Sequence, residues 1–282
     1  MNEIIGKRYI IGKKLGNGNF CSVYKGHHRK TNAEVAIKLE SDTSIIKLLQ
    51  HETTVLKYLY ERDVRNIPAI SWYGKSSEYT CLVMSIYDCS LYDYILSKKE
   101  ITVSKIQSIV YQLIDIFRVI HDNGVIHRDV KPQNIMVKNG ELFLIDFGFS
   151  TFYIDEDGEH CQNSCSECII GSPKYVSYYI HSGSISSRRD DLISLGYLYL
   201  FLHNKTLPWE NITTDSTLVE EYDETSIFHY KNLIRQKQKE IDIILPLCKD
   251  TDSILCNYVK YVYSLEYDQI PNYNAILNMF QT

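Results

Sequence analysis

The chain has 282 residues, of which 44% are hydrophobic and 23% charged, and its formal net charge at pH 7 is -5. This composition is typical of a globular protein with a substantial buried core. The acidic balance argues against a protein whose main role is to bind nucleic acid, which would need a basic excess. The longest apolar run, residues 192–202, is about half of the ~20 residues that a membrane span needs, so we expect no membrane partner.

We expect an intracellular protein, in the cytoplasm or the nucleus. The N-terminal residues lack the apolar run and cleavage site of a secretory signal. Eight cysteines are too few for a disulfide-built scaffold, and in a reducing compartment most would be free thiols. The 23 tyrosines and abundant Ile, Asn and Lys are typical of an AT-rich genome, and a viral or parasite protein in a host cell fits them.

The first ninety residues predict β-strands with one helix. Apolar or alternating segments predict strands at residues 9–15, 23–28, 33–39, 67–72 and 79–86. Residues 44–60 have helical spacing, with Ile45 on the apolar face, and Ser44 or Thr43 could cap this helix.

Helices dominate the rest of the chain. The apolar face of residues 101–122 predicts a long amphipathic helix, and residues 188–203 a buried one. Between them, strands at 135–137 and 142–145 flank a turn, and residues 151–172 are polar and irregular.

These patterns predict an α+β fold with two lobes. A small antiparallel sheet with one helix would form an N-lobe over about residues 1–86. A larger, mainly helical C-lobe would follow over about residues 90–282. Residues 1–282 would then be a single domain.

The segment Gly16-Asn17-Gly18-Asn19-Phe20-Cys21 places two glycines between two predicted strands. A dinucleotide-binding loop would lie between a strand and a helix, so a hairpin loop that covers nucleotide phosphates fits better. Glycine lets backbone amides approach the phosphates closely. Cys21 stands where the usual pattern has a third glycine, and a plain hairpin turn is the alternative interpretation.

Lys38 lies on the third predicted strand among apolar neighbours, and Glu52 lies in the helix that follows. An ion pair between them would hold the ammonium against the α- and β-phosphates of a nucleotide. Taken separately, a strand lysine is more often a solvated edge charge, and a helix carboxylate is more often exposed.

The strongest signal is the segment of residues 127–134, HRDVKPQN, followed by Asp146-Phe147-Gly148. Asp129 is the candidate catalytic base, and Lys131 can neutralise charge on a transferring phosphoryl group. Asn134 and Asp146 supply oxygen ligands of the kind that Mg²⁺ prefers. Each residue alone could be an ordinary polar loop residue, but their order and spacing are those of phosphoryl transfer.

In this order, the motifs resemble those of the eukaryotic protein kinase superfamily over nearly the whole chain. Lys131 followed by Pro132 is similar to the serine/threonine class. Residues 171–177 (GSPKYVS), 187–197 (SRRDDLISLGY) and 207–209 (LPW) resemble the casein kinase one family.

This resemblance implies an ATP- and Mg²⁺-dependent serine/threonine kinase that acts on protein substrates as a monomer, without nucleic-acid or membrane partners. It implies that Asp191 accepts backbone amides of the catalytic loop. It also implies a nucleotide site in which Met84 is the gatekeeper, Ser85, Ile86 and Tyr87 form the hinge, and apolar residues surround adenine. These apolar residues, which core packing would predict almost as well, are Leu15, Val23, Ala36, Met136 and Ile145.

Two other functions remain open at this point. A catalytically weak pseudokinase could act as a binding scaffold on the same fold, although none of Lys38, Asp129, Asn134 and Asp146 is missing. A kinase-like enzyme could phosphorylate a small molecule, but Lys131-Pro132 and the long segment after Asp146 argue against it.

The substrate preference of the resembled family is in question here. Its members often prefer acidic or phosphorylated substrates. Lys174, with Arg188 or Arg189, could read such a phosphate, but four nearby carboxylates would repel an anionic peptide. They belong to Asp155, Glu156, Asp157 and Glu159.

His160, Cys161, Cys165 and Cys168 have a spacing that could hold Zn²⁺. The first part of this spacing is atypical for zinc. A mobile loop with free thiols is therefore the preferred interpretation, with zinc binding and reversible disulfide chemistry as alternatives.

Overall fold

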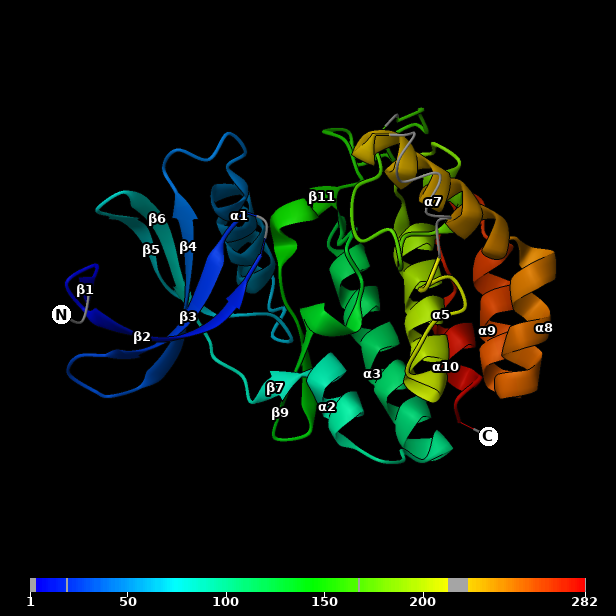
Figure 1. Ribbon diagram of the computed structural model, residues 1–282, viewed down its shortest axis with the longest axis horizontal. Helices are drawn as coiled ribbons and strands as arrows, with labels where there is room; N and C mark the ends of the chain where they lie inside the picture. Colours follow the sequence, from blue (N-terminus) through cyan, green and yellow to red (C-terminus); the bar gives the residue numbers. More distant parts are fainter. Residues whose placement is uncertain (1–3, 19, 167, 213–222, 282) are drawn as a thin grey trace. The chain divides into compact units, whose positions relative to one another are not determined.

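The computed structural model describes residues 4–18, 20–166, 168–212 and 223–281 (Figure 1). The chain divides into two compact units. We call Met1–Ser90 with Ile135–Ser150 the sheet unit, and Leu91–Asn134 with Thr151–Thr282 the helical unit. An antiparallel sheet dominates the first and helices dominate the second, which confirms the predicted α+β fold class.

The sheet unit contains an antiparallel six-stranded sheet in the order β1-β2-β3-β4-β6-β5. The strands are β1 (Ile4–Ile5), β2 (Tyr9–Asn17), β3 (Ser22–His28), β4 (Glu34–Ser41), β5 (Ile70–Ser76) and β6 (Tyr79–Met84). A three-stranded sheet contains β7 (Cys89–Ser90), β9 (Ile135–Lys138) and β10 (Glu141–Leu144). Asn139 and Gly140 both have positive φ and close the β9–β10 hairpin, as predicted.

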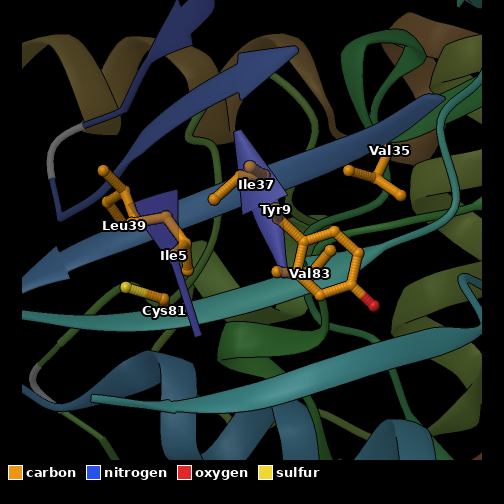
Figure 2. Close-up of a cluster of buried hydrophobic side chains, with 7 residues drawn as sticks. All are labelled: Ile5, Tyr9, Val35, Ile37, Leu39, Cys81 and Val83. Atoms are coloured by element: carbon orange, nitrogen blue, oxygen red, sulfur yellow. The ribbon is translucent and has the colours of Figure 1, made fainter. Parts of the chain in front are cut away.

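The core of the sheet unit fixes which way β4 faces. Side chains alternate along a strand, so Val35, Ile37 and Leu39 project together into one apolar cluster (Figure 2). This cluster consists of Ile5, Tyr9, Val35, Ile37, Leu39, Cys81 and Val83. Lys38 and Glu40 therefore project from the opposite face of β4, where both are buried.

The helix of the sheet unit, α1 (Leu48–Glu61), begins four residues later than predicted. Ser44 is in a turn closed by its amide on the Ser41 carbonyl, and Ile45 is 99% exposed, so the predicted cap and apolar contact are both wrong. Instead, the Glu40 carboxylate accepts the Leu48 and Leu49 amides at 2.8 and 3.1 Å. A carboxylate from β4 therefore satisfies the first amides of α1 and interacts favourably with the helix dipole.

The helical unit has α5 at its centre, packed between α3 and α9 (Figure 1). All residues of α5 from Arg188 to Leu202 are buried, as expected for a helix that is covered on every side. Thr102 caps α3 by accepting the Lys105 amide. The helices are α2 (Leu91–Ser97), α3 (Val103–Asp122), α4 (Tyr178–His181), α5 (Arg188–Asn204), α7 (Glu224–Gln238), α8 (Ile241–Thr251), α9 (Ser253–Tyr263) and α10 (Tyr273–Asn278).

Two short strands, β8 (Val125–Ile126) and β11 (Thr151–Phe152), also pair in the helical unit. Among the helices in the described ranges, none is both long enough and apolar enough to span a bilayer.

Loss of the Glu40 cap should destabilise the sheet unit. We expect Glu40→Ala to lower the free energy of unfolding by about 1–2 kcal/mol, because it leaves two amides of α1 without their acceptor. Glu40→Gln should lose less, because its amide oxygen can still accept. Urea denaturation measures both effects, with Glu61→Ala at the other end of α1 as the control. Equal stabilities of the Glu40→Ala variant and the wild type would contradict the cap.

Candidate active site

Three segments of the sheet unit converge on the Lys38 ammonium. Lys38 Nζ donates to Glu52 Oε2 from α1 at 2.7 Å and to Asp146 Oδ1, which follows β10, at 2.7 Å. The Lys38 and Glu52 side chains are only 8% and 1% exposed, whereas that of Asp146 is 39% exposed. The predicted Lys38–Glu52 ion pair is thus present, and Asp146 joins it.

The charge of Lys38 depends on these two carboxylates. Burial alone would lower the pKa of the ammonium, but Glu52 and Asp146 outweigh burial and raise the pKa above its usual value. The side chain therefore remains a cation at neutral pH and is fixed in position.

The backbone at Asp146 is held in an unusual conformation. Its φ and ψ are both 67°, in the left-handed region that non-glycine residues rarely adopt. The next residues form a 3₁₀ turn, Phe147–Phe149, that packs against α1 with the Phe147 ring fully buried. Packing of this turn and the bond from Lys38 together aim the partly exposed Asp146 carboxylate.

The glycine loop is the β2–β3 hairpin. The Gly18 amide donates to the Cys21 carbonyl at 2.8 Å, and Ser22 Oγ donates to Asn17 Oδ1 at 2.7 Å. Phe20 meets Phe149 edge to face, with ring centroids 6.0 Å apart. Gly16 and Gly18 are exposed, and Asn19 lies outside the described residues.

The Cys21 thiol is influenced by the charges of Lys38, Asp146 and Glu52, yet it is not activated. Burial raises its pKa to about 11, and the opposing effect of Lys38 is smaller. The neutral thiol is therefore a packing group in the hairpin.

The residues predicted to surround adenine all lie in the sheet unit. Ala36 pairs with Met84 between β4 and β6, and Val23 pairs with Lys38 between β3 and β4. Met84 is buried, whereas Leu15 is 52% exposed.

The residues predicted to form the hinge follow β6, where neighbouring groups hold Ser85 and Tyr87. The Ser85 amide donates to the Ala69 carbonyl at 3.0 Å, and Ser85 Oγ accepts the Ala69 amide at 3.2 Å. The Tyr87 ring packs on Phe143, with centroids 4.7 Å apart. Met136, opposite Phe143 on β9, and Ile145, after β10, complete the predicted set.

In the helical unit, four donors surround the buried Asp129 carboxylate. Its Oδ2 accepts Lys131 Nζ at 2.6 Å and Asn134 Nδ2 at 2.9 Å. Its Oδ1 accepts the Ser172 amide at 2.9 Å and Ser172 Oγ at 2.7 Å. Lys131 Nζ also donates to Ser172 Oγ at 3.0 Å, so one hydroxyl bridges the carboxylate and the ammonium.

Asp191 braces the backbone of this catalytic loop. Its carboxylate accepts the His127 amide at 2.7 Å, the Arg128 amide at 2.9 Å and His121 Nε2 at 3.0 Å. Burial would raise the pKa of Asp191, but these contacts lower it below its usual value. The role predicted for Asp191 is confirmed, and it holds Arg128 in the left-handed region, with φ of 67°.

Gly171 brings Ser172 to Asp129. Its φ is +100°, and a Cβ at this position would lie 2.2 Å from the Arg128 carbonyl oxygen. Only glycine permits this close approach. From the sequence, Ser172 was only part of the 171–177 segment, and no chemical role was predicted for its hydroxyl. Its position directly after a glycine in the 171–177 segment was the available signal.

The sequence was also compared with known protein families. Residues 9–261 match the family described as the protein kinase domain. The chain belongs to the protein kinase family. Kinases of this family are ATP-binding phosphotransferases that act on protein substrates and generally use Mg²⁺. Each of the two candidate metal ligands, Asn134 in the helical unit and Asp146 in the sheet unit, carries a side-chain oxygen of the kind that such an ion prefers.

Of the three basic residues predicted to read a substrate phosphate, two are buried and the third is paired with a carboxylate. Arg188 is buried and donates to the Asp268 carbonyl at 2.6 Å. Arg189 is buried and stacks on the Tyr179 ring at 3.6 Å. Lys174 forms an ion pair with Glu210. The prediction that Arg188 or Arg189 reads a phosphate is therefore wrong, because each guanidinium is used inside the helical unit.

In the loop that carries His160, Cys161, Cys165 and Cys168, the described residues do not form a metal-binding group. The His160 ring packs between the Tyr153 and Tyr267 rings, with centroids 5.1 and 5.0 Å away. Cys165 and Cys168 are exposed free thiols. No group of three His, Cys, Asp or Glu residues suited to a metal ion occurs in the described ranges, so the structure does not support the zinc alternative.

A buried lysine fixes the loop that carries Ser172. Lys239, at the end of α7, is fully buried and donates to the Pro173 carbonyl at 3.0 Å and the Val176 carbonyl at 2.7 Å. Its ammonium also lies over the Tyr197 and Trp209 rings, at 4.9 and 5.3 Å from their centroids. Within the described residues it has no carboxylate partner. Burial therefore lowers its pKa well below the usual value.

His181 makes this region sensitive to acid. Its Nε2 lies 3.2 Å from Lys239 Nζ, and burial together with the charge of Lys239 lowers the pKa of His181 to about 3. His181 is thus neutral in the folded kinase but protonates near pH 6.5 when the chain unfolds. Its contribution to stability is complete above pH 6.5 and declines as the pH falls toward 3.

We expect His181→Gln to remove this acid sensitivity. The free energy of unfolding of the wild type should fall faster than that of the variant, by at most about 1.4 kcal/mol per pH unit below pH 6.5. Denaturation at pH 7.0, 6.0 and 5.0 measures the difference. The exposed His229→Gln variant is the control, and parallel curves for the wild type and His181→Gln would exclude a neutral buried imidazole.

Proposed function

We propose that this protein kinase is a serine/threonine kinase of the casein kinase one type, and that residues 1–282 form a single kinase domain. The observation that carries the proposal is the Asp129 carboxylate, held by Lys131, Asn134 and Ser172. A carboxylate fixed by this many donors can orient a hydroxyl group and accept its proton.

Each residue then has a role in the transfer. Lys38 and the glycine loop would position the ATP phosphates, and Asn134 and Asp146 would hold Mg²⁺, which would supply positive charge to offset that of the phosphates. Asp129 would orient the substrate hydroxyl and accept its proton as the new O–P bond forms, while the bond between the γ-phosphorus and the bridging oxygen breaks and ADP leaves. Lys131 stabilises negative charge on the transferring group. Most of the rate acceleration would come from positioning and electrostatics.

Two observations favour catalysis over the pseudokinase alternative. Lys38 is charged and held by two carboxylates, which a scaffold that does not use ATP would not need. The Asp129 carboxylate, the candidate base, accepts hydrogen bonds from a cation, Lys131, and from the amide of Asn134, a candidate metal ligand. We therefore propose an active enzyme that works inside the cell as a monomer and requires neither nucleic acid nor a membrane.

Transfer of radiolabelled phosphate to casein tests this proposal. We expect wild-type protein with ATP and Mg²⁺ to label serine and threonine in casein, and Asp129→Asn to lower the rate by about 10²- to 10⁴-fold. Phosphoamino-acid analysis identifies the labelled residue. A wild-type rate equal to that of Asp129→Asn would favour the pseudokinase, and labelled tyrosine would exclude the serine/threonine assignment.

Ser172 should contribute to the rate through its hydroxyl. Ser172→Ala removes the bridge between Asp129 and Lys131, and loss of hydrogen bonds to charged groups should lower kcat by about 10- to 100-fold. Ser172→Thr retains a hydroxyl and should recover part of the loss. Steady-state kinetics measure both variants, with Ser182→Ala as the control. An unchanged kcat for Ser172→Ala would show that the bridge has no role in transfer.

A further inference from the structure

The N-terminal strands concentrate positive charge in an otherwise acidic protein. Residues 4–33 contain seven of the 30 Lys and Arg residues and none of the 35 Asp and Glu residues. We call these seven residues the basic surface: Lys7, Arg8, Lys13, Lys14, Lys25, Arg29 and Lys30. All belong to β2, β3 or the turns beside them in the sheet unit.

Backbone contacts bring two of these turns together. The Arg29 amide, in the β3–β4 turn, donates to the Arg8 carbonyl, in the β1–β2 turn, at 2.8 Å. The Arg29 guanidinium donates to the Lys7 carbonyl at 3.2 Å. The side chains of Lys7, Arg8, Arg29 and Lys30 are all exposed at this end of the sheet. Four cations distant in sequence therefore share one region of the surface.

A hollow of about 420 Å³ adjoins these turns. It is lined by Lys13 on β2, Lys25 and His27 on β3, and Asn32 and Glu34 near the start of β4, and two glycines, Gly12 and Gly26, complete its wall. The lining therefore contains two lysine cations, a histidine ring and an asparagine amide that could bind an anionic group. Among the described residues, the only carboxylate in the lining is that of Glu34.

The positive charge is largely uncompensated. Lys25 forms an ion pair with Glu34 at 2.5 Å, but both side chains are about half exposed, so the pair is weak. For the other six members of the basic surface, the described part of the chain provides no carboxylate partner. Such a concentration of exposed cations produces a positive local potential that attracts anionic groups.

The three basic residues of the helical unit that were predicted to read a phosphate are poorly placed to bind an acidic substrate. Lys174 is neutralised by Glu210, Arg188 and Arg189 are buried, and residues 155–159 present four exposed carboxylates. Recognition of an acidic protein by this kinase would therefore need cations other than these three. Because the substrates of protein kinases are proteins, an acidic polypeptide fits the basic surface better than nucleic acid does.

We propose that the basic surface is a docking site for an acidic segment of the protein substrate. In the substrate's own sequence, this segment is separate from the residue that is phosphorylated. The turns would bind the segment through exposed cations, and the hollow would take one carboxylate or phosphate group from it. This inference rests on the family's protein substrates and not on the choice between serine, threonine and tyrosine.

Binding tests the docking site independently of catalysis. The probe is a fluorescein-labelled peptide of twelve glutamates, titrated with the Asp129→Asn protein at low ionic strength. We expect Lys13→Glu with Lys25→Glu, and separately Lys7→Glu with Lys30→Glu, to weaken binding by roughly 10-fold or more, because each pair reverses two charges. The Lys98→Glu, Lys99→Glu double variant carries the same charge change on exposed lysines of the helical unit and should bind within 2-fold of its parent.

Kinetics then test whether docking serves the reaction. The substrates are a serine peptide with and without an acidic extension, assayed with the catalytically intact protein. We expect both basic-surface variants to raise KM only for the extended peptide and to leave kcat and the KM for ATP unchanged. Added salt should abolish the advantage of the extension.

Several results would overturn the proposal. If the Lys98→Glu, Lys99→Glu control bound the peptide as weakly as the basic-surface variants do, the loss of affinity would come from net charge alone and not from a docking site. Unaltered binding by both basic-surface variants would exclude the site. Tighter binding of a 20-base-pair duplex DNA, or of vesicles containing phosphatidylserine, than of the acidic peptide would assign the surface to a different partner. If casein labelling failed while peptide binding behaved as expected, the docking site would stand and the proposed catalytic activity would not.

Discussion

The sheet unit depends on keeping one ammonium ion charged away from water. Burial penalises the charge of Lys38, and only two carboxylates from distant parts of the sequence offset that penalty. The same three side chains therefore tie β4 to α1 and to the segment that follows β10. The two ion pairs that offset the cost of burying the Lys38 cation also fix the position of its ammonium. They leave the Asp146 carboxylate partly exposed.

In the helical unit, contacts to backbone groups hold the chain around the buried Asp129 carboxylate. Asp191 accepts two amides of the loop that precedes Asp129 and holds Arg128 in a conformation that it would rarely adopt alone. Gly171 then permits an approach that any side chain would block. Just after Gly171, Lys239 fixes the carbonyls of Pro173 and Val176. Ser172 reaches Asp129 because all three constraints act on adjacent stretches of chain.

The sequence predicts elements whose signal is local. The strands that carry Lys38 and the glycine loop alternate clearly, and helix spacing locates α1, α3 and α5, although the start of α1 was missed. That start depends on Glu40, a residue of the preceding strand whose side chain reaches the helix only in the folded unit. A cap that is distant in sequence leaves no local signal.

The candidate site was predictable to the extent that it consists of motifs. Spacing alone suggested Lys38, Asp129, Asn134 and Asp146. The bridging hydroxyl of Ser172 could not be foreseen, because it depends on the path of an irregular loop. The burial of Arg188 and Arg189 was likewise unpredictable, because charged residues are usually exposed and only the packing of α5 shows otherwise.

The alternation of β4 has a consequence for how this chain can change over evolutionary time. Apolar side chains fill one face of the strand, and Lys38 and Glu40 project from the other, so both faces are committed. Deletion or insertion of one residue ahead of Lys38 would exchange the faces, driving an ammonium among aliphatic side chains and turning Ile37 toward the carboxylates. Length variation should therefore be confined to the turns that flank this strand, while the strand itself tolerates only substitution.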